Sequence, residues 1–158
     1  MSDPGGMLAG MAETSVPFRV QIPIRVSDLD PQLHVTGAAY QQFADHARFA
    51  CVTEAGVSVP DFLAAGVGPV NLELNVRYLR ELRANDTVEV DCRWEWGQGK
   101  TYRVEHTLTR DDGEVAATVS YVSGLLDLRT RKLVADPARV WTEHARDPAL
   151  LGLSPRPA

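Results

Sequence analysis

One helical pattern followed by a run of strand patterns is the feature that most constrains the fold of this chain. Residues 37–56 carry apolar and small side chains at helical spacing, many of them alanine, and Gly56 is a suitable helix end. Residues 18–26 alternate apolar with other side chains, as expected of a strand with one buried face. A single helix cannot cover both faces of a sheet. We therefore expect it to lie across one face of a strongly curved antiparallel sheet, which is an α+β arrangement.

Four further strand patterns follow the helix, and turn signals separate them. They lie at 71–80, 87–96, 101–110 and 114–128. Asp112-Gly113 predicts a hairpin, and Gly124 is a candidate bulge inside the last strand. Residues 137–145 are typical of a short helix, with Asp136 as its cap.

The ends of the chain and the first strand complete this outline. Pro23 cannot donate a hydrogen bond to a neighbouring strand, so it indicates an edge position or a bulge. We find no internal repeat, and the patterns predict one domain at 16–146, a flexible tail at 1–15 and a loose tail at 147–158.

Composition excludes several classes of protein. The chain has 158 residues and a net charge of −5, which argues against binding to duplex nucleic acid. No apolar run reaches the ~20 residues that span a bilayer, and the start does not resemble a signal peptide. Cys51 and Cys92 lie in apolar surroundings without the spacing of a zinc site or a disulfide framework, so we expect buried thiols and a cytoplasmic location.

Charged, cyclic and small residues gather where the first strand meets the helix. Residues 27–40 read SDLDPQLHVTGAAY, with two aspartates, a proline, a lone histidine and a glycine at the predicted helix start. Asp28 and Asp30 are common turn residues, and aspartate before proline often begins a turn. On its residues alone, this corner is either a turn or a turn that carries chemistry.

Short motifs along the chain resemble one family when they are taken in order. They are Ser27-Asp28-Leu29-Asp30, His34-Val35, Ala39-Tyr40, Phe43, Val76-Arg77-Tyr78-Leu79-Arg80, Asp86-Thr87-Val88-Glu89-Val90, Gly99-Lys100-Thr101 and Asp112-Gly113-Glu114-Val115-Ala116. The series covers roughly residues 17–135 and resembles hotdog-fold acyl-CoA thioesterases, most closely the 4-hydroxybenzoyl-CoA thioesterase type. The resemblance implies a long helix wrapped by a curved antiparallel sheet, and dimers or tetramers with active sites between subunits.

The chain departs from this family at two places in the corner. Leu33 stands where a glycine is usual before the histidine, and Thr36-Gly37 stands where asparagines are common. The backbone of the loop and the acyl pocket are therefore expected to differ from those of the family.

The resemblance places the catalytic aspartate of the family at Asp30. An ionised carboxylate can act as a general base on water, or attack the thioester directly to give a mixed anhydride. Gly37 falls where the family has the amide that binds the oxyanion, and a helix start offers unpaired N–H groups for that purpose. His34 either orients water or the thioester, or pins the loop. We see no Ser-His-Asp arrangement and no zinc spacing among the four histidines.

Substrate binding requires an acyl pocket and cations for the phosphates of coenzyme A. The resemblance implies that Asp45, on the helix, faces the acyl pocket, and four apolar residues are candidate lining residues: Phe43, Phe49, Phe62 and Leu63. Arg77 and Arg80 lie near one strand end, where arginine suits phosphate. Lys100 and Thr101 lie at a glycine-containing turn and are the binding residues best supported by the resemblance.

The sequence thus predicts hydrolysis of an acyl-CoA thioester, without a metal or cofactor, by a homodimer or homotetramer. Three alternatives remain open. They are a thioesterase acting on acyl carrier protein, a hotdog protein that binds acyl-CoA without catalysis, and, more remotely, a dehydratase.

Overall fold

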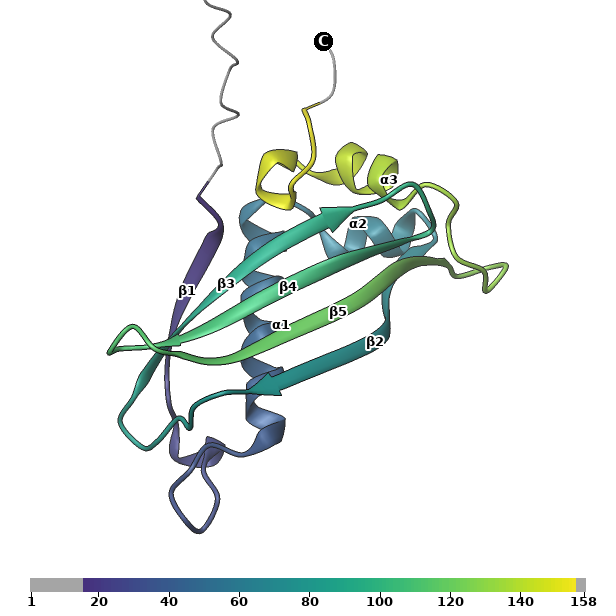
Figure 1. Ribbon diagram of the computed structural model, residues 1–158. Coiled ribbons are helices and arrows are strands. Elements are labelled where there is room, and N and C mark those ends of the chain that lie inside the picture. The colour runs from purple at the N-terminus through teal and green to yellow at the C-terminus, as the bar shows by residue number, and fades with distance from the viewer. Residues whose placement is uncertain (1–15, 156–158) are drawn as a thin grey trace, which may run out of the picture.

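The computed structural model describes residues 16–155 as one antiparallel sheet with a long helix across one face (Figure 1). The strands are β1 (Phe18–Pro23), β2 (Val67–Tyr78), β3 (Thr87–Trp96), β4 (Thr101–Arg110) and β5 (Val115–Asp127). The helices are α1 (Gly37–Glu54), α2 (Val59–Ala64) and α3 (Pro137–His144), with short 3-10 turns η1 (Val26–Asp28) and η2 (Pro148–Leu151). The predicted α+β arrangement is confirmed.

The strand order in the sheet is β1-β3-β4-β5-β2, and every pairing is antiparallel. β1 and β2 are therefore the two edges, which explains why Pro23 is tolerated in β1. The register between β2 and β5 shifts between Asn71 and Glu73, so the irregularity lies in β2.

Gly124 does not form the bulge that the sequence predicts. It pairs in regular register with Val70 on one side and Thr101 on the other. A Cβ at this position would lie 2.9 Å from Leu133 Cδ2 and 3.2 Å from the Lys100 carbonyl oxygen. Close packing, rather than a bulge, therefore accounts for the glycine.

The core lies between α1 and the sheet, which its small side chains approach closely. Ala44 and Ala47 are fully buried on α1, and so are Val90 and Val104 on the facing strands. Thr36 caps the helix, since its Oγ1 accepts a hydrogen bond from the Ala39 N–H. α1 begins at one end of the sheet and runs toward the other, where α2, α3 and η2 gather (Figure 1).

The C-terminal segment is more ordered than the sequence predicts. In place of a loose tail from residue 147, Pro148–Leu151 form η2, and Leu151 is fully buried. The Leu151 carbonyl accepts a hydrogen bond from the Trp96 indole N–H at 2.6 Å. Proline in the first turn and an apolar anchor fix this segment. The predicted tail at 1–15 and residues 156–158 lie outside the described residues.

β2 is the exposed edge, and apolar side chains on it face solvent. Leu72, Leu74 and Tyr78 are 48%, 41% and 57% exposed. An edge strand offers unpaired N–H and C=O groups, and this one also offers apolar surface, so it is suited to pairing with another chain.

Candidate active site

Asp28 and Asp30 have different environments at the corner between β1 and α1. Asp28 is buried, and its carboxylate accepts hydrogen bonds from the backbone N–H and the guanidinium of Arg25. The Asp28 carbonyl accepts a further bond from the Thr36 N–H at 2.9 Å. Asp28 therefore holds the corner together and is not free to react.

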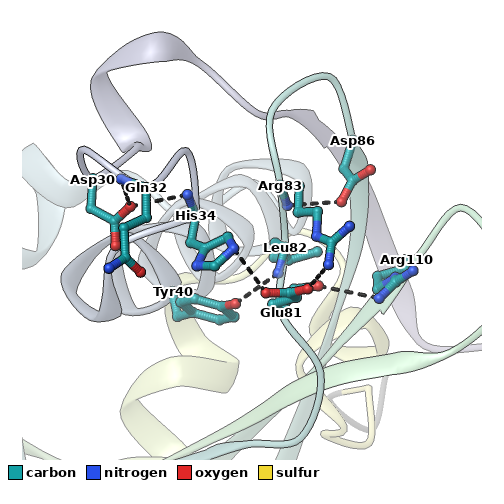
Figure 2. A network of polar contacts seen from close by, with 9 residues as sticks. All are labelled: Asp30, Gln32, His34, Tyr40, Glu81, Leu82, Arg83, Asp86 and Arg110. Atoms are coloured by element: carbon teal, nitrogen blue, oxygen red, sulfur yellow. Dashed lines mark hydrogen bonds and ion pairs between the residues drawn. The ribbon is translucent and has the colours of Figure 1, made fainter.

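Asp30 closes the loop that leads to α1. Its Oδ1 accepts hydrogen bonds from the N–H groups of Gln32 and His34, at 2.9 and 3.0 Å (Figure 2). Its own N–H donates to the His34 carbonyl at 2.8 Å, and Leu33 in between has the left-handed φ of 63°. Among the described residues no hydrogen bond reaches Oδ2. Asp30 is thus half-buried, and one of its oxygens remains available.

His34 connects the corner to the segment that follows β2. Its Nε2 lies 3.1 Å from Glu81 Oε2, and Glu81 also pairs with Arg83 (Figure 2). The hydrogen bond from Arg83 lowers the pKa of Glu81, so this carboxylate is ionised at neutral pH. The structure therefore gives His34 a charged partner that fixes its ring.

The N-terminus of α1 lies at a shallow hollow of about 440 Å³, lined by Val35, Gly37, Tyr40, Tyr78, Leu79, Arg80 and Glu81. Tyr78 donates a hydrogen bond to the Gly37 carbonyl at 3.3 Å, and a Cβ at Gly37 would lie 3.1 Å from the Tyr78 oxygen. The first N–H groups of a helix lack intrahelical acceptors and carry partial positive charge. This hollow brings together Gly37 and Arg80 of the predicted set, while Asp30 is not among its lining residues.

A second cavity, of about 360 Å³, lies farther along α1. Thirteen residues line it: Asp45, Arg48, Phe49, Val52, Val57, Val59, Phe62, Pro69, Asn71, Trp94, Tyr102, Ser123 and Trp141. Asp45, Phe49 and Phe62 were expected at an acyl pocket, and they lie here. Phe43 is buried and Leu63 is 55% exposed, and neither of them lines this cavity.

Asp45 belongs to a hydrogen-bonded cluster that sequence reasoning missed. Its Oδ1 accepts from the Tyr121 hydroxyl at 2.7 Å and from Arg48 at 3.1 Å. Arg48 also donates to Asn71 Oδ1 at 2.8 Å and lies over the Tyr121 ring. Burial, together with the bond to Asp45, raises the pKa of Tyr121, so its hydroxyl stays protonated and donates. Arg48 follows Asp45 by one helical turn, so the sequence could have indicated this pair. The contact with Tyr121 could not be predicted in this way, because it depends on how β5 packs on α1.

His106 is the buried histidine next to this cluster. Its ring packs edge-on against Tyr121, and its Nδ1 lies 2.8 Å from the Asp91 carbonyl oxygen. Burial lowers the pKa of His106 to about 4, so the imidazole is neutral at pH 7. It is a core residue and lines neither hollow.

The other residues predicted to bind substrate lie far from one another in a single chain. Arg77 is exposed near the end of β2 that leads to the hollow at α1. Lys100 and Thr101 lie at the turn between β3 and β4, near α3 and at the opposite end of the sheet (Figure 1). One chain alone therefore does not bring the two pairs of predicted binding residues together.

No group of three or more His, Cys, Asp or Glu side chains within residues 16–155 is arranged to hold a metal ion. None of the described helices is both long enough and apolar enough to cross a membrane.

Comparison with known proteins places these features in a family. The profile of the thioesterase-like superfamily matches residues 24–144. The L-carnitine dehydrogenase/betainyl-CoA thioesterase of Agrobacterium fabrum is 26% identical over 129 residues, which is 81% of this chain but 26% of that protein. This chain thus spans about a quarter of that relative. The long-chain acyl-CoA thioesterase FadM of Escherichia coli is 26% identical over 119 residues, covering 75% of this chain and 89% of FadM.

Solved structures share the fold. Protein SAV2348 of Staphylococcus aureus, determined in complex with CoA, superposes with a TM-score of 0.76 at 20% identity, covering 94% of this chain and 92% of that one. The probable thioesterase YbaW of Escherichia coli gives 0.66 at 24% identity, covering 75% and 90%. The hotdog fold that the motifs imply is confirmed.

Proposed function

The chain belongs to the thioesterase-like superfamily, and from this premise we propose that it hydrolyses an acyl-CoA thioester to the free acid and coenzyme A. One observation carries the proposal: α1 starts with a glycine at an open hollow, directly after a loop that holds a carboxylate with one unoccupied oxygen. The thioesterase names of both relatives, and the CoA bound to the Staphylococcus neighbour, support the substrate class.

The N–H groups at the start of α1 supply the electrostatic part of the reaction. When a nucleophile adds to the thioester carbonyl, negative charge develops on its oxygen, and the N–H groups near Gly37 stabilise that charge. A Cβ at Gly37 would lie 3.1 Å from the Tyr78 hydroxyl oxygen, so the missing side chain keeps the start of α1 uncrowded.

Asp30 supplies the proton transfer or the nucleophile. As a base, its Oδ2 takes a proton from water, the resulting hydroxide adds to the carbonyl, and the C–S bond breaks to release the thiolate. As a nucleophile, Oδ2 attacks the carbonyl carbon, the C–S bond breaks to release the thiolate and leave a mixed anhydride, and water then cleaves the anhydride to the free acid and the Asp30 carboxylate. In both cases Oδ1 keeps the loop closed, and His34, held by Glu81, orients water or the thioester.

A second copy of the chain completes the site in this proposal. Pairing two β2 edges about a two-fold axis covers the apolar side chains of β2 and extends the sheet. It sets the two α1 helices antiparallel on the same face, so the N-terminus of one approaches the middle of the other. It also brings one chain's Arg77 and Arg80 toward the opposite end of its partner, where that chain carries Lys100 and Thr101. We propose that these three cations and the Thr101 hydroxyl together bind the phosphates of coenzyme A.

The finer assignments remain part of the same proposal. The order of motifs favours the 4-hydroxybenzoyl-CoA thioesterase type, and free, buried Cys51 and Cys92 favour a reducing cytoplasm.

The first test is turnover of an acyl-CoA panel, followed with a thiol-reactive dye. We expect thiol release by the wild-type protein and a loss of at least ~100-fold in kcat for Asp30→Asn, the scale of lost acid–base catalysis. Asparagine keeps an oxygen for the two loop amides, so folding should be retained. Asp112→Asn is the matched control, because Asp112 closes a comparable turn at the distant β4–β5 hairpin.

Two results would count against the proposal. Unchanged turnover in Asp30→Asn would remove Asp30 from the mechanism. Absence of thiol release from every acyl-CoA, with acyl-CoA binding retained, would favour a binding protein without catalysis.

A further inference from the structure

The 360 Å³ cavity is a chamber that narrows from an open rim to a closed end. One face of α1 lines the chamber with Asp45, Arg48, Phe49 and Val52. At 1.5 Å per residue, the stretch from Asp45 to Val52 is about 10 Å long. At one end Phe49 is 64% exposed, and Asn71, which accepts a hydrogen bond from Arg48, is exposed too. Phe62 and Trp141 at the other end are 0% and 2% exposed. A ligand therefore enters at the rim of Asp45 and Asn71 and ends at the aromatic residues.

The polar groups of the rim are already hydrogen-bonded to one another. Asp45 accepts from Tyr121 and Arg48, and Asn71 Oδ1 accepts from Arg48 and from the Ser123 hydroxyl at 3.1 Å. An entering group need not supply hydrogen bonds to satisfy these oxygens. Beyond the rim, the described lining is mainly apolar and aromatic, although the buried indole nitrogens of Trp94 and Trp141 have no hydrogen-bond partner among the described residues. The chamber is thus suited to a largely apolar acyl group.

The closed end is built by two short helices that pack on each other. Trp141 of α3 lies edge-on to Phe62 of α2, with 4.7 Å between ring centroids, and to Trp94 of β3, with 5.2 Å. Phe62 is held from its other side by the His144 ring at 4.8 Å. Asp136 caps α3, so the helix that carries Trp141 has a fixed start. The indole of Trp141 is therefore a well-supported end wall.

We propose that this chamber receives the acyl chain of the substrate and that Trp141, supported by Phe62, sets the longest chain that fits. The inference rests on the proposed thioesterase function. In the proposed dimer, the start of the partner's α1 approaches the middle of this chain's α1, and the chamber rim lies at that point. One water molecule occupies roughly 30 Å³ in the liquid, and we take the same volume for each non-hydrogen atom of the acyl chain. The 360 Å³ cavity then holds about a dozen such atoms. The preferred substrate is thus a medium-chain acyl thioester.

The test compares chain-length profiles of wild type and two end-wall variants. Thiol release is measured with straight-chain acyl-CoAs from butanoyl to octadecanoyl, for wild type, Trp141→Ala and the milder Trp141→Leu. We expect wild type to be most active with medium chains. In Trp141→Ala the ratio of kcat/KM for hexadecanoyl-CoA to kcat/KM for octanoyl-CoA should rise at least about tenfold. About tenfold is the lower end of the effect on kcat/KM when a single methylene group gains or loses its place in an apolar pocket.

Trp96→Ala is the matched control. Trp96 stacks on Trp94 in the same aromatic cluster, yet it does not line the chamber. Its loss should lower stability without moving the length profile. Binding of non-hydrolysable acyl-thioether analogues of acyl-CoA, followed by tryptophan fluorescence, gives a readout that does not depend on turnover and serves if a variant folds poorly at assay temperature.

The outcomes separate the two proposals. Turnover with an unchanged length profile in both Trp141 variants, or an equal shift in Trp96→Ala, overturns the chamber assignment alone. Absence of turnover in wild type, while the thioethers bind with a length preference that Trp141→Ala extends, overturns hydrolysis and supports the chamber. Equal thioether binding at all lengths in wild type and variants overturns the chamber.

Discussion

At the scale of single residues, the two oxygens of Asp30 have different surroundings. Oδ1 is fixed by two loop amides, and this bonding orients Oδ2. A carboxylate on a freely rotating side chain would lose this orientation, and orientation contributes a large share of catalysis. The turn interpretation and the catalytic interpretation of this corner are therefore compatible, because the turn occupies Oδ1 alone.

Gly37→Ala should leave the fold intact and reduce activity. Alanine is tolerated at a helix start, but its methyl group would lie 3.1 Å from the Tyr78 oxygen and crowd the hollow. We expect kcat/KM to fall between about tenfold and a hundredfold, the scale of small displacements at a reacting centre. Adding Tyr78→Phe removes the oxygen that the methyl meets, so the double variant should recover part of the loss. If the single variant is fully active, the start of α1 does not bind the oxyanion.

His106 should make the protein less stable in mild acid. Its folded-state pKa of about 4 lies below the ~6.5 of an unfolded chain, so the folded state disfavours the proton. The contribution of neutral His106 to the free energy of unfolding is on the order of 3 kcal/mol. It is fully present above about pH 6.5 and is lost as the pH falls toward 4.

Urea unfolding at several pH values checks this expectation. The free energy of unfolding of His106→Gln should depend less on pH across that window than that of wild type. An identical pH dependence in the two proteins would exclude His106 as its source.

At the scale of elements, the edge strand β2 connects fold and function. It carries exposed apolar side chains, unpaired backbone groups and an irregular register at the rim of the chamber. Its burial by a second copy would complete a site whose parts lie at opposite ends of one chain.

Leu74→Lys tests this role of β2. A charge at the centre of the paired edges is disfavoured, so the variant should sediment as a monomer at concentrations where wild type is a dimer. Turnover should fall in parallel with dimer content. Leu63→Lys is the control, because Leu63 is similarly exposed but lies on α2. A fully active monomeric Leu74→Lys would show that one chain suffices.

Sequence patterns predict elements better than they predict contacts. The period-two segments place every strand of the sheet, and the alanine-rich stripe places α1, because both depend on local spacing. The bulge predicted at Gly124 is wrong, because a glycine in a strand indicates either a bulge or a close neighbour. The sequence does not distinguish the two, since only the fold brings Leu133 beside Gly124. The Asp45–Tyr121 bond and the Trp141 end wall join segments far apart in the chain, so no local pattern reveals them.

At the scale of the whole molecule, the positions of the residues proposed to bind substrate favour the proposed shared site. Arg77 and Arg80 lie toward one end of the sheet, and Lys100 and Thr101 lie at the other. In the proposed dimer a two-fold axis brings one chain's Arg77 end to its partner's Lys100 end, so each composite site would take one half from each chain.

Mixing two inactive variants should restore activity if the site is shared. Asp30→Asn and Lys100→Ala chains are denatured together and refolded, so about half of the dimers are mixed. One of the two sites in each mixed dimer then has both native residues, and we expect about a quarter of wild-type turnover. Activity no greater than the average of the two parents would place Asp30 and Lys100 in the same half of the site.

The packing of η2 and α3 has a practical consequence for handling the protein. α3 supplies Trp141 to the end of the ligand cavity, while η2 lies outside the cavity lining and buries Leu151 in the core. Proteolytic trimming or a bulky fusion that disturbs these turns should therefore lower the melting temperature as well as alter substrate choice, so a tag is better placed elsewhere when selectivity is being measured.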